Sequence, residues 1–462
     1  MNKSKPYRKS DRRKKSLPKQ LKQINPNAAG IDIGSEEHYV AIPEDRDQQP
    51  VRSFGCLTPE LHQMAKWLKK CGVDTVAMES TGVYWVPVAE VLEQYGFDVK
   101  LVDAYHVKNV PGRKTDVKDC QWLQQLHMFG LLRGAFRPEK QIRVLRSYWR
   151  HRAGLVKACG RQIQLMQKAL EQMNLQLHKV IADISGVTGM KIIRAIIAGQ
   201  RDPVILAQMK HHLIRSSQET IAQALTGAYS EEHLFSLKQA VELYDIYKDK
   251  TGDCDREIER YMSTFKAKGD PKNIGQQRAK NKRGCKNAPQ FNLRTELYKI
   301  TGVDLTQIDA IDVMTAHTVI CECGYDMSPF PTEKHFSSWL GLCPNNRITG
   351  GKVFSSRTRK VQNRISTVLR VAAQSLHRSK TALGAYYRRM RGRLGAPKAI
   401  TAAAHKLAIL IYRMLKYGED YVDKGQSYYE EQYRTRVLKN LKTRARQMGY
   451  ELLAVKTGEL VS

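Results

Sequence analysis

The chain has 462 residues, of which 77 are Lys or Arg and 45 are Asp or Glu, giving a formal net charge of +32 at pH 7. No apolar run approaches the roughly 18 residues of a membrane span, and residues 1–22 are too polar for a signal peptide. The composition therefore argues against a membrane or secreted protein. It predicts a soluble, cytoplasmic protein whose positive field attracts nucleic acid.

The first segment, residues 1–25, is predicted to be a disordered basic arm. Residues 1–22 hold ten Lys or Arg and a single acidic residue, Asp11, with almost nothing apolar to pack. Such a segment cannot offset the entropy cost of its own ordering. Its functional interpretation is a phosphate-binding tail, and the alternative is a solubilising extension with no specific role.

Residues 26–143 alternate between strand-like and helix-like patterns, which predicts a layered α/β sheet with its site at the strand ends. A hairpin around Gly34 opens the segment, and later apolar runs are flanked by amphipathic helical stretches. The expected strands are 28–33, 38–42, 75–79 and 98–102, and the expected helices are 58–71, 87–95 and one that starts at Thr115.

The rest of the chain is predicted to be mostly helical. Residues 144–268 carry apolar residues at three- and four-residue spacings in two long stretches, 144–184 and 231–265, which favours a helical hairpin or coiled coil used for dimerisation or spacing. A basic linker follows at 269–290. Residues 291–425 are globular and mostly helical, and residues 426–462 form a helical tail.

Four carboxylates are the candidate metal ligands: Asp32, Glu79, Asp116 and Asp119. Asp32 lies inside an apolar strand, Glu79 ends another, and Asp116 and Asp119 share one face of a helix start. Each has a simpler interpretation, since Asp32 is also compatible with a turn and the other three with acidic first turns of helices. Together they appear in the order strand, strand, helix that an RNase H-like metallonuclease uses. That order predicts a site for one or two Mg²⁺ ions acting on a phosphodiester.

A second candidate site lies around Thr349, which is followed by two glycines and Lys352. A hydroxyl, flexible backbone amides and a cation suit a phosphate group, although an ordinary glycine turn is the simpler interpretation. Nearby cations are compatible with phosphate contacts or with a solvated face. The predicted nucleic-acid-binding residues are Lys114, Lys352, Arg357, Arg359, Lys360 and Arg364.

These motifs resemble the DEDD transposases of insertion-sequence family 110, especially the group named for insertion sequence 1111. The resemblance spans residues 30 to 425 and rests on Gly30-Ile31-Asp32, Met78 to Gly82, Lys114-Thr115-Asp116 with Asp119, Ile300 to Leu305, Phe336 to Pro344, Gly350-Gly351-Lys352 and Leu394 to Ala399. It implies a RuvC-like catalytic domain, a coiled-coil insertion and a C-terminal transposase domain with a nucleophilic hydroxyl. It also implies DNA as substrate, a structured noncoding guide RNA, a homodimer assembling to a homotetramer, and a bacterial cytoplasm, at the nucleoid when DNA is bound.

The sequence departs from this family at two places. The nucleophilic serine before the two glycines is replaced by Thr349, whose extra methyl crowds the attack on phosphorus and stiffens χ1. The glycines of a helix-hairpin-helix turn are missing from Ile308-Asp309-Ala310-Ile311-Asp312, which weakens a minor-groove contact. The expected function is still RNA-guided excision and insertion of the element. The alternatives are a hydrolytic RuvC-type junction nuclease and a nucleic-acid-binding protein weakened by the threonine.

Overall fold

A computed structural model of the chain describes residues 22–80, 82–102, 116–276, 287–418 and 421–452. The chain divides into two compact units, residues 1–137 and 138–462, which are described separately below. Almost all of the predicted arm, 1–25, and the middle of the predicted linker, 269–290, lie outside the described residues. Among the described helices, none is long and apolar enough to cross a membrane.

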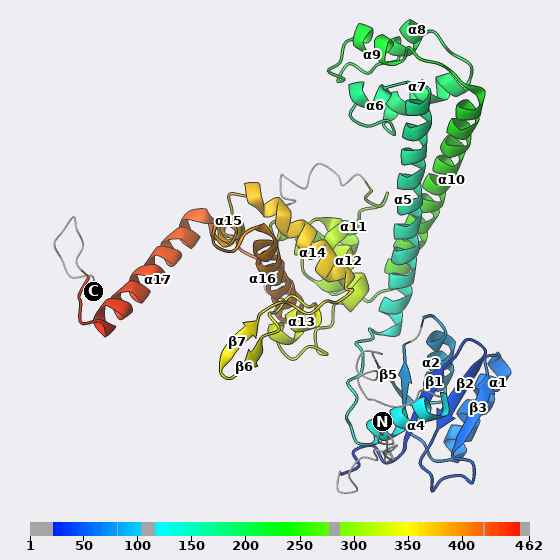
Figure 1. Cartoon of the computed structure of the whole chain (residues 1–462), viewed down its shortest axis with the longest axis vertical. Coiled ribbons are helices and arrows are strands. Elements are labelled where there is room, and N and C mark those ends of the chain that lie inside the picture. The colour runs from blue at the N-terminus through cyan, green and yellow to red at the C-terminus, as the bar shows by residue number, and fades with distance from the viewer. Residues whose placement is uncertain (1–21, 81, 103–115, 277–286, 419–420, 453–462) are drawn as a thin grey trace, which may run out of the picture. The chain divides into compact units, whose positions relative to one another are not determined.

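The first unit contains a five-stranded sheet in the order β3-β2-β1-β4-β5 (Figure 1). Strand β2 runs antiparallel to both β1 and β3, whereas β4 is parallel to β1 and to β5. The strands are β1 (Ala28–Ile33), β2 (Glu37–Ala41), β3 (Val51–Gly55), β4 (Thr75–Glu79) and β5 (Asp98–Val102). The predicted α/β sheet is confirmed, but β3 was missed because this short edge strand is only partly buried and follows a polar run.

The two faces of this sheet have different coverings. On one face, Ile31, Ile33 and Met78 pack against α1 (Thr58–Lys70) and α2 (Trp85–Gln94) in a buried apolar core. On the other face lies α4 (Asp116–Met128). Because side chains alternate along a strand, Gly30 and Asp32 belong to the α4 face. The candidate carboxylate of β1 is therefore on the side of the sheet that α4 covers.

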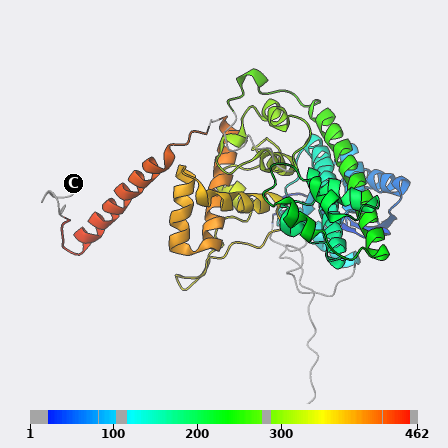
Figure 2. The same cartoon turned by 90° about the horizontal axis from the view of Figure 1, so that it is seen from above.

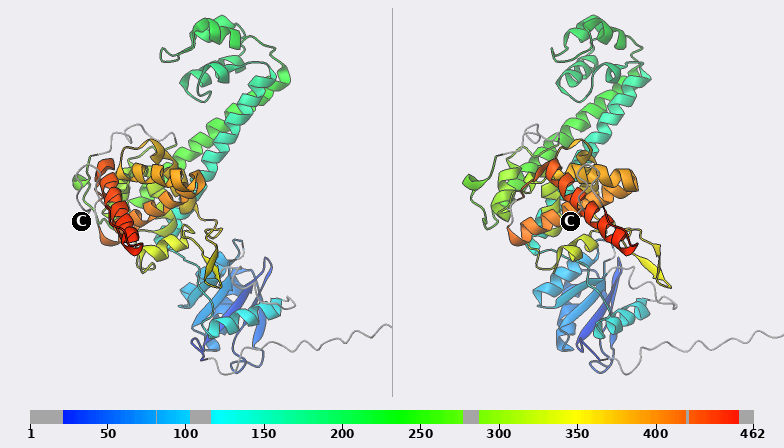
Figure 3. Two further views of the ribbon diagram at one scale, coloured as in Figure 1. Left: turned by 60° about the vertical axis from the view of Figure 1, so that its left-hand side comes forward. Right: turned by 90° about the vertical axis from the view of Figure 1, so that its left-hand side faces the viewer.

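The second unit begins with two long helices that lie side by side, α5 (Lys140–Gln172) and α10 (Glu231–Met262) (Figures 1 and 3). Helix α5 ends earlier than the predicted stretch 144–184, because Asn174 adopts the left-handed conformation (φ 55°) just after it. Four short helices separate the two long ones and share an apolar core with them: α6 (Leu177–Val180), α7 (Val187–Ile197), α8 (Pro203–Gln208) and α9 (Gln218–Ala224).

A buried ion pair joins α5 to α10. The Arg152 guanidinium donates to the carboxylate of Asp255, and both side chains are almost wholly buried. The backbone N–H of Gln290 also donates to Asp255, at 3.3 Å. Removing one partner of such a pair leaves the other charge buried and uncompensated.

We therefore expect Asp255→Ala to lower the free energy of unfolding by about 3–5 kcal/mol. The matched control is Asp253→Ala on the same helix, because its ion pairs with Lys250 and Arg256 are exposed and contribute little to stability. Urea unfolding followed by helical circular dichroism measures both. Equal effects of the two substitutions would contradict the importance of the buried pair.

The remainder of the second unit is a helical body with one small hairpin. Helix α16 (Ala396–Tyr417) packs against α13, α14 and α15, and its buried Tyr412 donates a hydrogen bond to the carbonyl of Phe330 at 2.8 Å. The other elements are 3₁₀ helices Pro271–Asn273, Leu305–Gln307 and Leu376–Arg378, α11 (Leu293–Thr301), α12 (Val313–Cys323), α13 (Glu333–Trp339), β6 (Arg347–Thr349), β7 (Lys352–Ser355), α14 (Arg364–Ser375), α15 (Ala382–Leu394) and α17 (Gly425–Gln447).

The turn before α12 keeps a glycine-like backbone without a glycine. Ala310 has φ 75°, in the left-handed region that costs a side chain roughly 1–2 kcal/mol. Its neighbours hold the turn: Asp312 caps α12 by accepting from the N–H of Thr315 at 2.7 Å, and the buried Asp309 accepts from the hydroxyl of Thr381 at 2.7 Å. Surrounding contacts thus impose the conformation on Ala310.

We expect Ala310→Gly to stabilise the protein by about 0.5–1 kcal/mol, because relief of the left-handed strain exceeds the entropy that glycine adds to the unfolded chain. The same change at Ala402, inside α16, should destabilise by about 1 kcal/mol. If Ala310 has the left-handed conformation, the two variants shift the thermal unfolding temperature in opposite directions. A loss of stability in Ala310→Gly would contradict it.

Candidate active site

Asp32 and Glu79 lie on neighbouring parallel strands at matching positions. In the pairing of β1 with β4, Ile31 faces Met78, so Asp32 and Glu79 follow one residue later on each strand. Their side chains therefore leave the sheet on the same face, the one that α4 covers. Both residues are half-buried. The register of β1 and β4 thus puts Glu79 next to Asp32 on the same face of the sheet.

Helix α4, which covers this face, contains the two remaining predicted acidic residues. Asp116 is its first residue and Asp119 lies one turn later, followed by the buried Cys120. Burial raises the pKa of the Cys120 thiol to about 12, and the negative charges of Asp32 and Asp119 add to this rise. Both carboxylates are therefore within electrostatic reach of one thiol. The side chain of Asp116 and the whole of Lys114 lie outside the described residues.

Gly30 allows α4 to pack close against β1. A Cβ atom at position 30 would stand 2.3 Å from the backbone nitrogen of Gln124 and 2.4 Å from the carbonyl oxygen of Cys120. Any other residue would force the helix away from β1. The glycine two residues before Asp32 thus sets the distance between α4 and β1.

We expect Gly30→Ala to lower the free energy of unfolding by about 1–3 kcal/mol, because the added methyl displaces α4. Gly134→Ala is the control, since a Cβ there meets nothing closer than 3.9 Å. Thermal unfolding is measured on both variants. Wild-type behaviour of Gly30→Ala would show that the close approach is not needed.

The described residues do not by themselves complete a metal site. Among them, no three His, Cys, Asp or Glu side chains are close enough together to hold one ion. The side chain of Asp116, which the sequence predicts as a fourth ligand, lies outside the described residues. The donor chemistry nevertheless suits Mg²⁺, which prefers carboxylate oxygens and keeps several waters.

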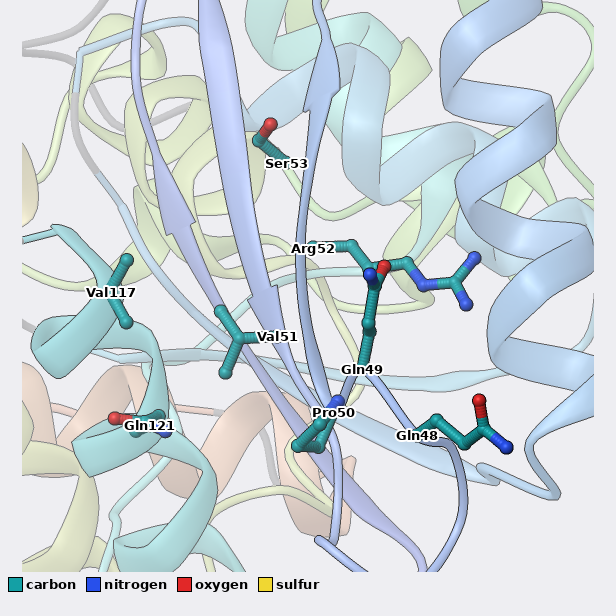
Figure 4. Close-up of a pocket in the computed structure, with 8 residues that line it drawn as sticks. All are labelled: Gln48, Gln49, Pro50, Val51, Arg52, Ser53, Val117 and Gln121. Atoms are coloured by element: carbon teal, nitrogen blue, oxygen red, sulfur yellow. The ribbon is translucent and has the colours of Figure 1, made fainter.

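An open hollow of about 790 Å³ lies between α4 and the edge of the sheet at β3 (Figure 4). Val117 and Gln121 of α4 form one wall, and Val51 and Ser53 of β3 belong to the facing edge of the sheet. The remaining lining residues are Gln48, Gln49, Pro50 and Arg52. Pairing across the strands sets Ser53 opposite Tyr39, and Tyr39 opposite Asp32, so one row of side chains leads from the hollow to the candidate site. Sequence reasoning missed this hollow because it depends on β3.

Thr349 lies in the second unit, at the tip of the hairpin formed by β6 and β7. Thr349 pairs with Lys352, and the two residues between them, Gly350 and Gly351, have φ values of 54° and 76°. Two successive positive φ values define the tight hairpin turn that favours glycine. The backbone here therefore forms a glycine turn, which was the simpler interpretation. The side chain of Thr349 is exposed beside this turn.

The predicted basic residues around this hairpin have different surroundings. Lys352, Arg357 and Lys360 are exposed. Arg359 donates to the carbonyl of Ser338 at 2.6 Å, and Arg364 lies 3.8 Å from the carboxylate of Glu322. Sequence reasoning missed the exposed apolar side chains of the same hairpin: Ile348, Val353 and Phe354. Short runs of β-branched and aromatic residues on either side of Gly-Gly are the signal that would have predicted the hairpin.

Two family models match the chain. The IS110 model for DEDD transposases, described as Transposase, matches residues 29–175, which contain all four predicted carboxylates. The model described as Transposase IS116/IS110/IS902 family matches residues 304–388, which contain Thr349 and the hairpin. The comparison with curated proteins found no match.

Proposed function

The chain belongs to the IS110 family of transposases, and we propose that it is a DNA recombinase that excises and inserts its own insertion sequence under the guidance of an element-encoded noncoding RNA. The observation that carries the proposal is the placement of Asp32 and Glu79 side by side on the face that α4 covers. The guide RNA rests on the resemblance to the insertion sequence 1111 group.

We assign Asp32, Glu79, Asp116 and Asp119 as the ligands of one or two Mg²⁺ ions in a RuvC-like domain. Such ions supply Lewis-acid stabilisation of the charge that develops on a scissile phosphate. The register of β1 and β4 sets the positions of Asp32 and Glu79, and the close contact at Gly30 sets the position of α4. Asp32 and Asp119 both act electrostatically on the buried Cys120 thiol, which supports a shared site for them.

We assign Thr349 as the nucleophile. Its exposed hydroxyl attacks phosphorus, forms a threonyl ester with the 5′ phosphate and breaks the bond to the 3′ oxygen, which leaves as a hydroxyl after taking up a proton. The ester keeps the energy of the broken bond, so strands can be exchanged without hydrolysis. We assign Lys352, which pairs with Thr349 across the hairpin turn, to binding this phosphate. Arg357, Arg359, Lys360, Arg364 and Lys114 are assigned to backbone contacts.

We further propose that the paired helices α5 and α10 serve as a coiled-coil region for assembly into a homodimer and then a homotetramer. Their apolar core and the buried Arg152–Asp255 pair stabilise the hairpin, and no catalytic residue is assigned to it. The net charge of +32 supports a polyanionic partner for the assembly.

The experiment that tests this function is a denaturing gel of cleaved DNA, with the purified protein, Mg²⁺ and the guide RNA transcribed from the flanking element. A protein-linked DNA band is expected. A free 5′-phosphate product would instead indicate a hydrolytic junction nuclease. Binding without any cleavage would indicate a transposase weakened by the threonine at position 349.

A further inference from the structure

Helix α17, Gly425–Gln447, buries none of its residues. Contacts with α15 lie in the first part of α17: Gln426 accepts from Arg388 at 2.7 Å, and the rings of Tyr429 and Tyr386 lie 6.2 Å apart. A little further on, the guanidinium of Arg389 lies 3.4 Å from the ring centre of Tyr433. Beyond this point the helix extends away from α15 and α16 (Figure 2).

The extended part of α17 is strongly basic. Residues 434–446 contain no acidic side chain, and their six cations are Arg434, Arg436, Lys439, Lys442, Arg444 and Arg446. None of the six forms an ion pair within the described part of the chain. Like charges at helical spacing repel, and an unpacked helix of this length is marginal in water. Something of opposite charge is therefore needed to stabilise this part of the helix.

Four of these cations form one face of the helix. Arg436, Lys439, Lys442 and Arg446 follow each other at spacings of three, three and four residues, which places them in one row about 15 Å long. Leu438 and Leu441 lie on a different side. The row contains no aromatic residue, whereas surfaces that bind single strands use aromatic side chains on which the bases stack.

We propose that the row Arg436, Lys439, Lys442 and Arg446 binds the sugar–phosphate backbone of a nucleic-acid duplex without reading its sequence. The aromatic contacts of Tyr429 and Tyr433 hold the base of the helix on α15, so the row projects from a fixed point. Phosphates of a DNA or an RNA duplex offer the same chemistry. This site goes beyond the proposed catalytic function, because it adds a binding surface that no step of cleavage requires.

The test compares the wild-type chain with a variant in which all four cations of the row become glutamine, a residue of similar helix propensity. Affinity for a fluorescent DNA duplex and for an RNA duplex is measured over a range of salt concentrations, in chelator so that no cleavage occurs. The variant is expected to bind DNA at least about tenfold more weakly at low salt, with a log–log salt slope shallower by about 3 to 4. A loss of affinity for only one of the two duplexes supports the site and shows which duplex it binds.

Two matched variants keep the proposal falsifiable. The first variant loses the same charge as the row variant, but from four exposed positions of α5 and α10 that become glutamine: Lys157, Arg161, Lys168 and Lys238. The second variant has glutamine in place of Leu438 and Leu441, on the other side of α17. The proposal would be overturned by an equal loss of affinity in the first variant. It would also be overturned by an unchanged salt slope in the variant that has glutamine at the four positions of the row. A loss confined to the leucine variant would also overturn it, because the leucines lie outside the row. Because only binding is measured, each result is independent of metal-dependent cleavage.

Discussion

Replacing Asp32 by asparagine is expected to reduce DNA strand cleavage by a hundredfold or more, on the order of 3 kcal/mol of transition-state stabilisation. Asparagine keeps the size of the side chain and its place on β1, but it removes one negative charge from the set that we assign to the cation. Cleavage in Mg²⁺ is measured as the initial rate on a labelled substrate. DNA binding should largely persist, because phosphate contacts come from the basic residues.

The control for this prediction is Asp98→Asn, which removes a carboxylate from the same sheet at the opening end of β5. Asp98 is exposed and lies 3.5 Å from Lys100, so its loss should leave cleavage close to wild type. Asp119→Asn should behave like Asp32→Asn. Full cleavage by either of these two variants in Mg²⁺ would show that the metal-site assignment is wrong.

The strands that carry the carboxylates were predictable because their patterns are strong and local. Strands β1, β4 and β5 are short apolar runs bounded by polar or turn residues, and the structure gives each the predicted limits. The pairing of Asp32 with Glu79 then follows from parallel strands of matched length. What sequence alone did not provide is the close approach at Gly30, which depends on the backbone of a helix ninety residues later.

Other features escaped prediction because they depend on tertiary context. The edge strand β3 is stabilised by pairing with β2, and without that strand the hollow beside Gln121 has no second wall. The end of α5 depends on a left-handed Asn174 inside an otherwise helical pattern. At Ala310 the sequence lacks a glycine, yet buried contacts of Asp309 still impose the left-handed turn. Local propensity was outweighed by packing in each case.

Replacing Thr349 by alanine is expected to abolish the covalent protein–DNA adduct, whereas replacing it by serine should keep or increase the adduct. Alanine removes the attacking oxygen. Serine keeps that oxygen and removes the methyl, which eases approach to phosphorus and restores rotation about χ1. Because the side chain at the hairpin tip is exposed, neither substitution should disturb the fold. The measurement is the protein-linked band on a denaturing gel, followed by peptide mapping of the trapped adduct.

Ser355 and Ser356 supply the matched controls for Thr349, since each carries a hydroxyl close to the same hairpin. The two-residue turn places Thr349 beside Gly350 at the tip, while Ser355 ends β7 and pairs with Arg347 at the base. Alanine at either serine should therefore leave the adduct intact. A hydrolytic enzyme would still cut DNA with alanine at position 349, because water would be the attacker, and a weakened transposase would cut only after the change to serine. An adduct mapped to Ser355, Ser356 or any tyrosine would rule out Thr349 as the nucleophile.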